Sequence, residues 1–211
     1  SDKQPVTVQL VAAKDFAGNP VVSPPSLTWT MDWSQDHQGP EVTKLQSTTH
    51  PTFVTDTFET GLGEWRTFGQ NGAKVEIDAT TAGAGTHSVG LTQQKQGSPM
   101  AAYMTTSTFT LESYPVISFD YRLDPSVKLD LVVRMTNGNE YPICFTDNPS
   151  GAVGAIRNAV ADGTWRHATV EVTQFLRQRQ TQGTLEVAAL YLTDRNQMDN
   201  PVGARARFDN L

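Results

Sequence analysis

The chain has 211 residues, of which 18% are charged, and its formal net charge is −6. Acidic side chains outnumber basic ones and no cluster of Lys and Arg occurs, which argues against a nucleic acid held by counterion release. The apolar runs are only a few residues long, so no segment has the length of a membrane-spanning helix. The single cysteine, Cys144, excludes an internal disulfide. We interpret it as an inert thiol buried in a strand, with a nucleophile as the alternative.

The first 46 residues carry two alternating segments separated by a turn-rich stretch. Val6 and Val8 alternate with polar residues in the first segment, and Trp29, Met31 and Trp33 do so in the second. Two strands do not make a stable sheet by themselves, so this row of large side chains needs a partner surface. Residues 47–51 are polar and end in proline, which predicts a linker.

The sequence of this segment resembles the closing half of a bacterial immunoglobulin-like domain. The resemblance covers residues 5–42 and rests on AKDFAGNPV (13–21), a strand carrying Trp, and the exit D-x-x-G-P-x-V (36–42). The opening strands of such a domain are missing. We therefore expect either a domain that the start of the chain cuts, or strands that pack on the following domain. The polar opening without a signal peptide leads us to expect a piece of a larger protein.

From residue 52 the sequence consists of short alternating strands separated by turn residues. This spacing is typical of an antiparallel, all-β sandwich. Only residues 173–180 have a helical pattern, with Thr173 as N-cap and Gly183 beyond the end. Outside residues 114–146, the expected strands are residues 73–78, 88–92, 103–110, 167–172, 185–192 and 205–211.

The clearest pattern lies in residues 114–146, which hold two strongly alternating runs and a weaker third. Turn residues separate the runs at Asp124-Pro125-Ser126 and Asn137-Gly138-Asn139. Because successive side chains of a strand point to opposite sides, we expect a meander of neighbouring strands with one apolar and one polar face. The predicted core residues, here and in the later strands, are Phe119, Leu131, Val133, Val170 and Val187.

Residues 52–211 resemble the galactose-binding-like jelly rolls found among carbohydrate-binding modules. The matching words are FETGLGEW (58–65), AGAGTHSVGL (82–91), FDYR (119–122), DGTWRHATVEV (162–172) and RFDN (207–210). The resemblance implies an antiparallel jelly-roll β-sandwich behind the partial immunoglobulin-like β segment. It also implies a modular bacterial protein that is secreted or attached to the cell surface.

In such modules a structural calcium ion often joins the first strand to the last. Carried over by position, Glu59 matches the acidic residue of the first motif, FETGLGEW, and Asp209 matches that of the last motif, RFDN. The turn around Thr86 would add backbone carbonyls. Calcium takes six to eight oxygen ligands, many of them carbonyls, so this donor set suits it. The alternative is that Glu59 and Asp209 are ordinary solvated acids at strand ends.

A sugar site on a sandwich needs aromatic rings for the apolar face of the sugar and polar side chains for its hydroxyls. We predict Tyr103, Arg122, Arg134 and Tyr141 as ligand-binding residues, with the two arginines on neighbouring strands and a neutral or acidic polysaccharide as the ligand. The alternative for the arginines is a solvated ladder of ion pairs with Asp120 and Asp130. Trp65, Phe68 and Trp165 are further aromatic candidates, and for Trp165 packing is the alternative.

Motifs of common enzymes are missing from the sequence. It contains no G-x-S-x-G, no H-E-x-x-H, no C-x-x-C and no E-x-D-x-x-E pair of carboxylates. We therefore predict a non-catalytic glycan-binding or accessory module, with the neighbouring domains of its parent chain as further partners. The alternatives are a calcium-stiffened spacer without a ligand and an enzyme of unfamiliar type.

Overall fold

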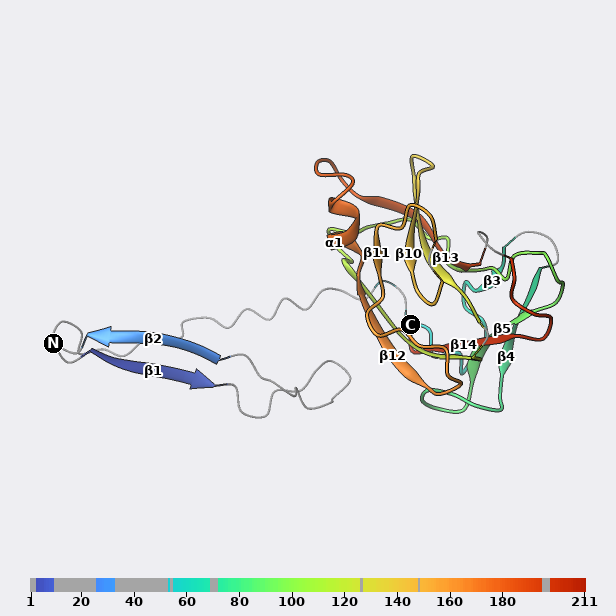
Figure 1. Ribbon diagram of the computed structural model, residues 1–211, viewed down its shortest axis with the longest axis horizontal. Helices are drawn as coiled ribbons and strands as arrows, with labels where there is room; N and C mark the ends of the chain where they lie inside the picture. The colour runs from blue at the N-terminus through green and yellow to red at the C-terminus, as the bar shows by residue number, and fades with distance from the viewer. Residues whose placement is uncertain are drawn as a thin grey trace. The chain divides into compact units, whose positions relative to one another are not determined.

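The computed structural model describes residues 3–9, 26–32, 53, 55–68, 72–125, 127–147, 149–194 and 198–211. The chain divides into two compact units, Ser1–Thr48 and Thr49–Leu211. In the first unit, β1 (Lys3–Gln9) pairs antiparallel with β2 (Ser26–Asp32), as Figure 1 shows. The rest of the immunoglobulin-like resemblance lies outside the described residues, and the partial immunoglobulin-like segment stays a prediction.

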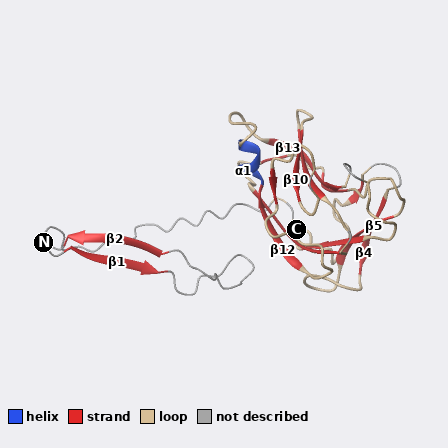
Figure 2. Ribbon diagram, in the orientation of Figure 1, coloured by secondary structure: helices blue, strands red, loops and turns tan. Residues whose placement is uncertain are grey.

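The described part of the second unit is an antiparallel β-sandwich of two sheets with one short helix (Figure 2), which confirms the predicted jelly-roll fold class. Among the residues that the structure describes, every strand pair is antiparallel except the short pair of β10 and β11. The larger sheet has the order β11 (Gly154–Ala155), β10 (Glu140–Cys144), β9 (Asp130–Met135), β13 (Glu186–Thr193), β6 (Ala102–Thr105) and β3 (Arg66–Thr67), and β7 (Phe109–Thr110) also pairs with β13. The smaller sheet has the order β12 (Arg166–Glu171), β8 (Val116–Leu123), β14 (Arg205–Asp209), β5 (Ser88–Gln93) and β4 (Ala73–Asp78).

The core lies between the two sheets and follows the alternation read from the sequence. In β8, the side chains of Phe119, Tyr121 and Leu123 are buried, while those between them are at least partly exposed. An apolar side chain gains free energy by leaving water, so the apolar faces of both sheets turn inward. The five predicted core residues, which are Phe119, Leu131, Val133, Val170 and Val187, are all buried in one cluster, and that prediction is confirmed.

The helix α1 (Val172–Arg177) is shorter than the predicted residues 173–180. Its N-cap is Glu171, which makes no capping bond through its side chain. The predicted cap, Thr173, lies inside the helix, and its hydroxyl donates to the backbone oxygen of Leu111 at 3.0 Å. Thr173 as N-cap is therefore wrong, because a hydrogen bond to another part of the chain takes up its hydroxyl.

The expected meander over residues 114–146 is half correct. β9 and β10 are neighbours joined through a turn at Gly138 (φ +86°), but β8 belongs to the other sheet. The segment that follows Asp124 therefore crosses between the sheets instead of closing a hairpin. β8 and β9 bury their apolar faces in the same core from opposite sides. Their sequences therefore alternate in the same way whether the two strands form a hairpin or lie in different sheets.

A β-bulge in β13 decides which of its side chains face the core. The register shifts between Val187 and Ala189, so that Val187 lies opposite Met135 and Ala189 opposite Arg134. Val187 and then Leu190 and Leu192 join the core. A bulge inserts one extra residue and so changes the side to which later residues point. Tyr191 consequently points away from the core.

Candidate functional site

Three aromatic side chains, here called the aromatic face, gather on the outer side of the larger sheet. Tyr103 and Tyr191 lie opposite each other on β6 and β13, with ring centroids 5.8 Å apart. Phe68, directly after β3, stacks on Tyr191 with centroids 4.9 Å apart and an angle of 18° between the rings. None of the three belongs to the core cluster, whereas the residues on either side of Tyr103, Ala102 and Met104, do.

Exposure differs among the three rings. Tyr191 is fully buried, while Phe68 and Tyr103 are half-buried. The guanidinium carbon of Arg66 lies 5.2 Å from the centroid of the Tyr103 ring, and its Nη2 donates to the hydroxyl of Thr106 at 2.8 Å. This is a cation–π contact held in place by a hydrogen bond. The aromatic face thus offers two partly exposed rings with a fixed positive charge beside them.

Glu64 ties together the segments that carry these groups. Its carboxylate accepts hydrogen bonds from the hydroxyl of Thr105 at 2.7 Å, from the backbone N–H of Thr106 at 2.8 Å, and from the hydroxyl and N–H of Ser107. The hydroxyls of Ser107 and Thr105 are the main donors that lower the pKa of Glu64 to about 2. An ionised Glu64 therefore fixes the end of β6 against the start of β3, and with it Tyr103 against Arg66.

Polar side chains flank the aromatic face on the next strands. Arg134 on β9 lies opposite Glu140 on β10 and opposite Ala189 on β13, and its side chain is exposed. Glu140 is half-buried. Val132, also on β9, lies opposite Tyr191 of the aromatic face and is 4% exposed. The outer side of this sheet therefore combines an aromatic part with a charged part.

The structure separates the four predicted ligand-binding residues. Tyr103 and Arg134 lie on the outer side of the larger sheet, but Tyr141 packs against the core and Arg122 lies on the smaller sheet. The prediction that Arg122 and Arg134 are on neighbouring strands is wrong, because the chain crosses between the sheets after β8. Trp65, one of the further candidates, is 2% exposed and belongs to the core.

Tyr191 was missed by reasoning from the sequence. A usable signal was present, since Tyr191 lies between Leu190 and Leu192, and alternation puts it on the side opposite two core residues. Its position next to Tyr103 depends on the pairing of β6 with β13 and could not be read from the sequence.

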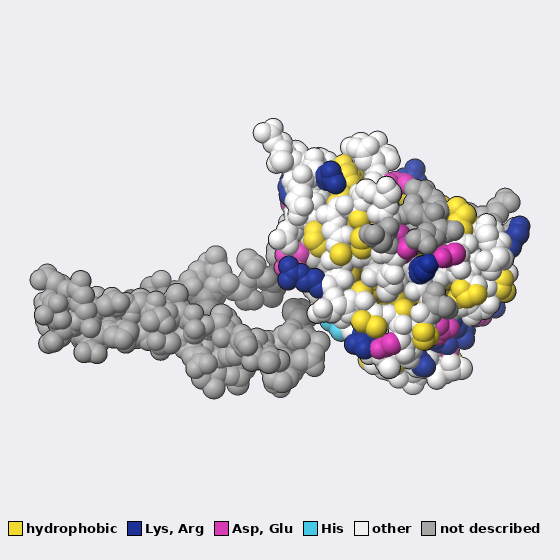
Figure 3. Space-filling view, in the orientation of Figure 1, with side chains coloured by type: hydrophobic (Ala, Val, Ile, Leu, Met, Phe, Trp, Pro, Cys, Tyr) yellow, Lys and Arg dark blue, Asp and Glu magenta, His cyan; other side chains and the backbone are white. Residues whose placement is uncertain are grey.

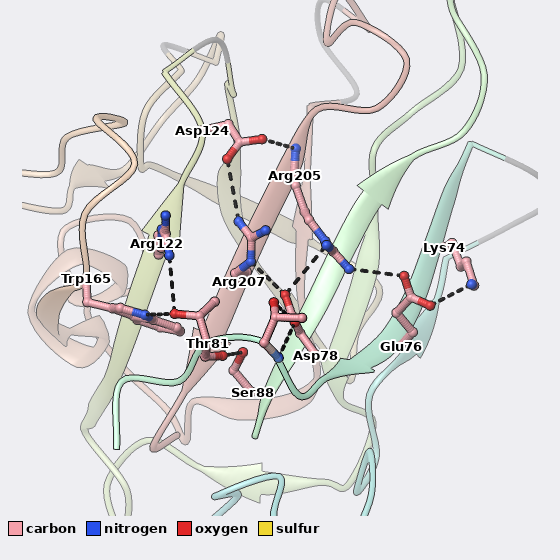
Figure 4. A network of polar contacts seen from close by, with 11 residues as sticks. Lys74, Glu76, Asp78, Thr81, Ser88, Arg122, Asp124, Trp165, Arg205 and Arg207 are labelled. Carbon is pink, nitrogen blue, oxygen red and sulfur yellow. Dashed lines mark hydrogen bonds and ion pairs between the residues drawn. The ribbon is translucent and has the colours of Figure 1, made fainter. Parts of the chain in front are cut away.

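The outer side of the smaller sheet carries a ladder of ion pairs, shown in Figure 4. Asp78 lies 2.7 Å from Arg207 Nε and 3.6 Å from Arg205 Nη1. Glu76 and Asp124 extend the ladder, pairing with Arg205 at 3.2 Å and with Arg207 at 3.5 Å. From the sequence, a ladder of ion pairs was predicted as an alternative to a binding site. That ladder was to consist of other residues, namely Asp120, Arg122, Asp130 and Arg134. The ladder observed here draws its residues from β4, β14 and the end of β8.

The predicted metal residues meet at the loop before β5. Glu59 accepts hydrogen bonds from the hydroxyl of Thr86 at 2.7 Å and from the N–H groups of Thr86 and His87 at 2.8 and 2.9 Å. These bonds, that of the Thr86 hydroxyl first, lower the pKa of Glu59 to about 2. A carboxylate with this many donors is stable as an anion without a metal ion.

Asp209 meets the same loop from β14. It is fully buried and accepts the N–H groups of Gly83 and Ala84, both at 2.9 Å. Burial raises the pKa of Asp209 above its ordinary value. Among the described residues, no group of three or more His, Cys, Asp and Glu is placed to hold a metal ion. The calcium site stays a prediction.

Cys144 lies on β10, and its side chain is half-buried rather than fully buried. Burial, followed by the nearby Asp130, raises the pKa of its thiol. A raised pKa reduces the thiolate fraction and with it the reactivity. This favours the inert thiol over the nucleophile.

Comparisons with known proteins give similar structures but no family. Neither a family model nor a curated protein matches the chain. One similar structure is a CBM22 xylan-binding domain of Paenibacillus barcinonensis Xyn10C, at 18% identity and TM-score 0.40 over 74% of this chain and 89% of that one. A second is a family 30 carbohydrate-binding module of a cellulosomal cellulase of Clostridium thermocellum, at 13% identity and TM-score 0.49 over 71% and 85%. A third is the C-terminal family 22 module of Clostridium thermocellum Xyn10B, at 13% identity and TM-score 0.43 over 77% and 92%. At this level of similarity, these structures do not assign a ligand to the chain.

Proposed function

We propose that this chain is a non-catalytic module that binds a glycan on the outer side of its larger sheet. Phe68 and Tyr103 supply the contact surface for the sugar rings, and Tyr191 supports them from below. The observation that carries the proposal is the aromatic face itself. Three rings are clustered outside the core, and two of them are partly exposed.

The chemistry of sugars fits such a surface. The C–H groups on one side of a pyranose ring are apolar, and they gain by covering a flat aromatic ring in water. Phe68 is stacked on Tyr191 and lies 4.8 Å from Tyr103, so contacts on two sides hold its ring. A ring that is already fixed loses little conformational entropy when a ligand covers it, which favours binding.

The charged groups on this side bear on the choice of glycan. Arg66 lies beside the aromatic face and Arg134 is exposed on β9. A guanidinium donates hydrogen bonds to sugar hydroxyls and forms paired bonds with a uronate carboxylate. We therefore include acidic polysaccharides among the ligands, with Arg134 in place of the predicted pair of arginines. Such a ligand fits the expected location of the module outside the cell or on its surface. The described residues contain no helix that is long and apolar enough to cross a membrane.

Affinity electrophoresis against a panel of neutral and acidic polysaccharides tests the proposal. We expect retardation on at least one polysaccharide, with loss of retardation in Phe68→Ala and Tyr103→Ala. Tyr114→Ala is the matched control, because Tyr114 is also half-buried but packs on Phe53 and Phe109. Retardation that is equal in all three variants would exclude the aromatic face as the binding site.

The second candidate function is a structural spacer without a ligand. One observation favours it: each ring of the aromatic face contacts the other two, and Arg66 lies over Tyr103, so part of the aromatic surface is already covered. Under this alternative no polysaccharide retards the protein, and Phe68→Ala only lowers its stability.

A further inference from the structure

A small hollow lies on the opposite side of the sandwich, on the outer side of the smaller sheet. It is lined by Gly83, Asp120, Trp165, Arg166 and His167, and its volume is about 220 Å³. This is below the roughly 300 Å³ at which pockets for drug-sized ligands begin, so the volume suits a single sugar ring. It shares no residue with the aromatic face or with the ion-pair ladder.

Hydrogen bonds fix the aromatic wall of the hollow. The indole Nε1 of Trp165 donates to the hydroxyl oxygen of Thr81 at 2.9 Å. Arg122 Nη1 donates to the same oxygen at 3.2 Å (Figure 4). Thr81 is itself held, because its backbone oxygen accepts the hydroxyl of Ser88 at 2.7 Å. Trp165 is only half-buried, so its indole is both anchored and partly accessible.

The polar wall of the hollow is oriented as well. Asp120 Oδ2 accepts the side-chain amide of Asn210 at 2.6 Å, and Asp120 Oδ1 lies 2.8 Å from His167 Nδ1. The side chains of Asp120 and His167 are 22% and 47% exposed, so both stay in reach of a ligand. A carboxylate oxygen has two lone pairs and can accept further O–H donors in addition to these bonds.

Gly83 keeps the hollow open. A Cβ at this position would lie 2.9 Å from the Cβ of Asp120 and 3.0 Å from its Oδ2. Any side chain there would therefore press on Asp120 and fill the space in front of it. The backbone of Gly83 is itself fixed, since its N–H donates to the buried Asp209.

We propose that this hollow is a second carbohydrate site, which binds a single neutral sugar residue, such as the end of a glycan chain. The partly exposed indole of Trp165 covers the apolar side of the ring, and Asp120 accepts hydrogen bonds from its hydroxyls. A neutral sugar is favoured over a uronate, because the carboxylate of Asp120 lines the hollow and Arg166 is already paired with Asp162. The site does not depend on the aromatic face, and together the two would let one module contact two glycans.

Nuclear magnetic resonance titration of the full chain tests this site. The probes are galactose, glucose, mannose and xylose, with glucuronate as the charged comparison, and the signals are the amides of Gly83 and His167 and the indole N–H of Trp165. We expect saturable shifts of these signals with at least one neutral sugar and weaker ones with glucuronate. Absence of saturable shifts with every neutral sugar, or tighter binding of glucuronate, would overturn the proposal.

Two variants and one control assign the effect. Asp120→Asn keeps the size of the side chain but removes its charge, so binding should weaken about tenfold or more, as expected for hydrogen bonds to a charged group. Gly83→Ala should strongly reduce the shifts, because its Cβ would press on the Asp120 side chain that accepts the sugar hydroxyls, and an unchanged spectrum elsewhere shows that the variant folds. Tyr103→Ala should leave the shifts unaltered, which separates this site from the proposed function. Binding that is unchanged in Asp120→Asn would refute the assignment.

Discussion

Asp78 is the most buried acid of the ion-pair ladder, and its replacement by Asn should change stability in a way that depends on pH. The residue is 3% exposed and accepts bonds from Arg207 Nε at 2.7 Å and from the N–H of Thr80 at 2.9 Å. Burial acts to raise the pKa of Asp78, but the bonds from Thr80 and Arg207 outweigh it and lower the pKa from 3.8 to about 2. The folded state therefore favours the ionised carboxylate.

The magnitude follows from that difference. A fall in the pKa of Asp78 from 3.8 to about 2 stabilises the folded state by about 2.5 kcal/mol, at about 1.4 kcal/mol for each pKa unit. Because the pKa is lowered on folding, this stabilisation is complete above the unfolded value of 3.8 and is lost as the pH falls toward 2. Arg205 and Arg207 keep Glu76 and Asp124 as partners, so the loss stays below the roughly 3–5 kcal/mol of a fully broken buried pair.

Urea unfolding followed by circular dichroism, from pH 7 down to pH 3, measures the effect. The free energy of unfolding of Asp78→Asn should lie about 2.5 kcal/mol below that of the wild type at pH 7, and this gap should narrow below about pH 4. Glu76→Gln is the control, since Glu76 is 34% exposed and its pairs are worth at most about 1 kcal/mol. A gap for Asp78→Asn that is the same at every pH would refute the electrostatic explanation.

Three further predictions concern backbone, thiol and metal. Gly85 and Gly97 have almost the same φ (+69° and +68°), but of the two only Gly85 would bring a Cβ close to Glu59, at 2.3 Å from its Oε1. Gly97→Ala should therefore lower the free energy of unfolding by about 1 kcal/mol, and Gly85→Ala should lower it clearly more. Equal losses in thermal unfolding would show that the Glu59 side chain moves aside. Cys144 in the folded protein should react with a thiol reagent at pH 8 far more slowly than in urea, because its thiol pKa is raised; equal rates would contradict this. If Glu59, Thr86 and Asp209 hold calcium, chelation should lower the melting temperature of the wild type but not that of Asp209→Asn, and identical melting curves with and without chelator would rule the ion out.

The strands and the core could be predicted because one physical rule sets both. A strand that buries one face must alternate, and Phe119, Leu131 and Val187 were found by that rule alone. The rule is local and needs no knowledge of which strand is the neighbour. It also assigned β4, whose observed range, Ala73–Asp78, is the predicted one.

The pairing of strands is what alternation cannot supply. Arg122 and Arg134 have equivalent positions in their strands, but the choice between a hairpin and a crossing after Asp124 puts them on different sheets. The bulge in β13 had a similar effect, because alternation counted from Val187 would turn Tyr191 inward, whereas alternation counted from Leu190 and Leu192 turns it outward. The sequence therefore indicated that an aromatic and charged outer side exists, but not which residues share it.

The two outer sides differ in the free energy that they can offer a ligand. On the smaller sheet, the acids of the ladder already pair with Arg205 and Arg207, so a sugar hydroxyl that bonds to one of them must displace an existing partner. Figure 3 shows basic and acidic side chains next to one another at several places on one face of the second unit. Exchange of one hydrogen bond for another yields little net free energy.

On the larger sheet, Phe68 and Tyr103 keep apolar surface in contact with water. Covering that surface yields free energy in proportion to its area, at roughly 25 cal/mol for each Å². The hollow at Trp165 is the exception on the smaller sheet, because the partly exposed indole of Trp165 lines it. Binding should therefore be centred on the partly exposed aromatic rings, with the charged groups beside them acting on the choice of sugar.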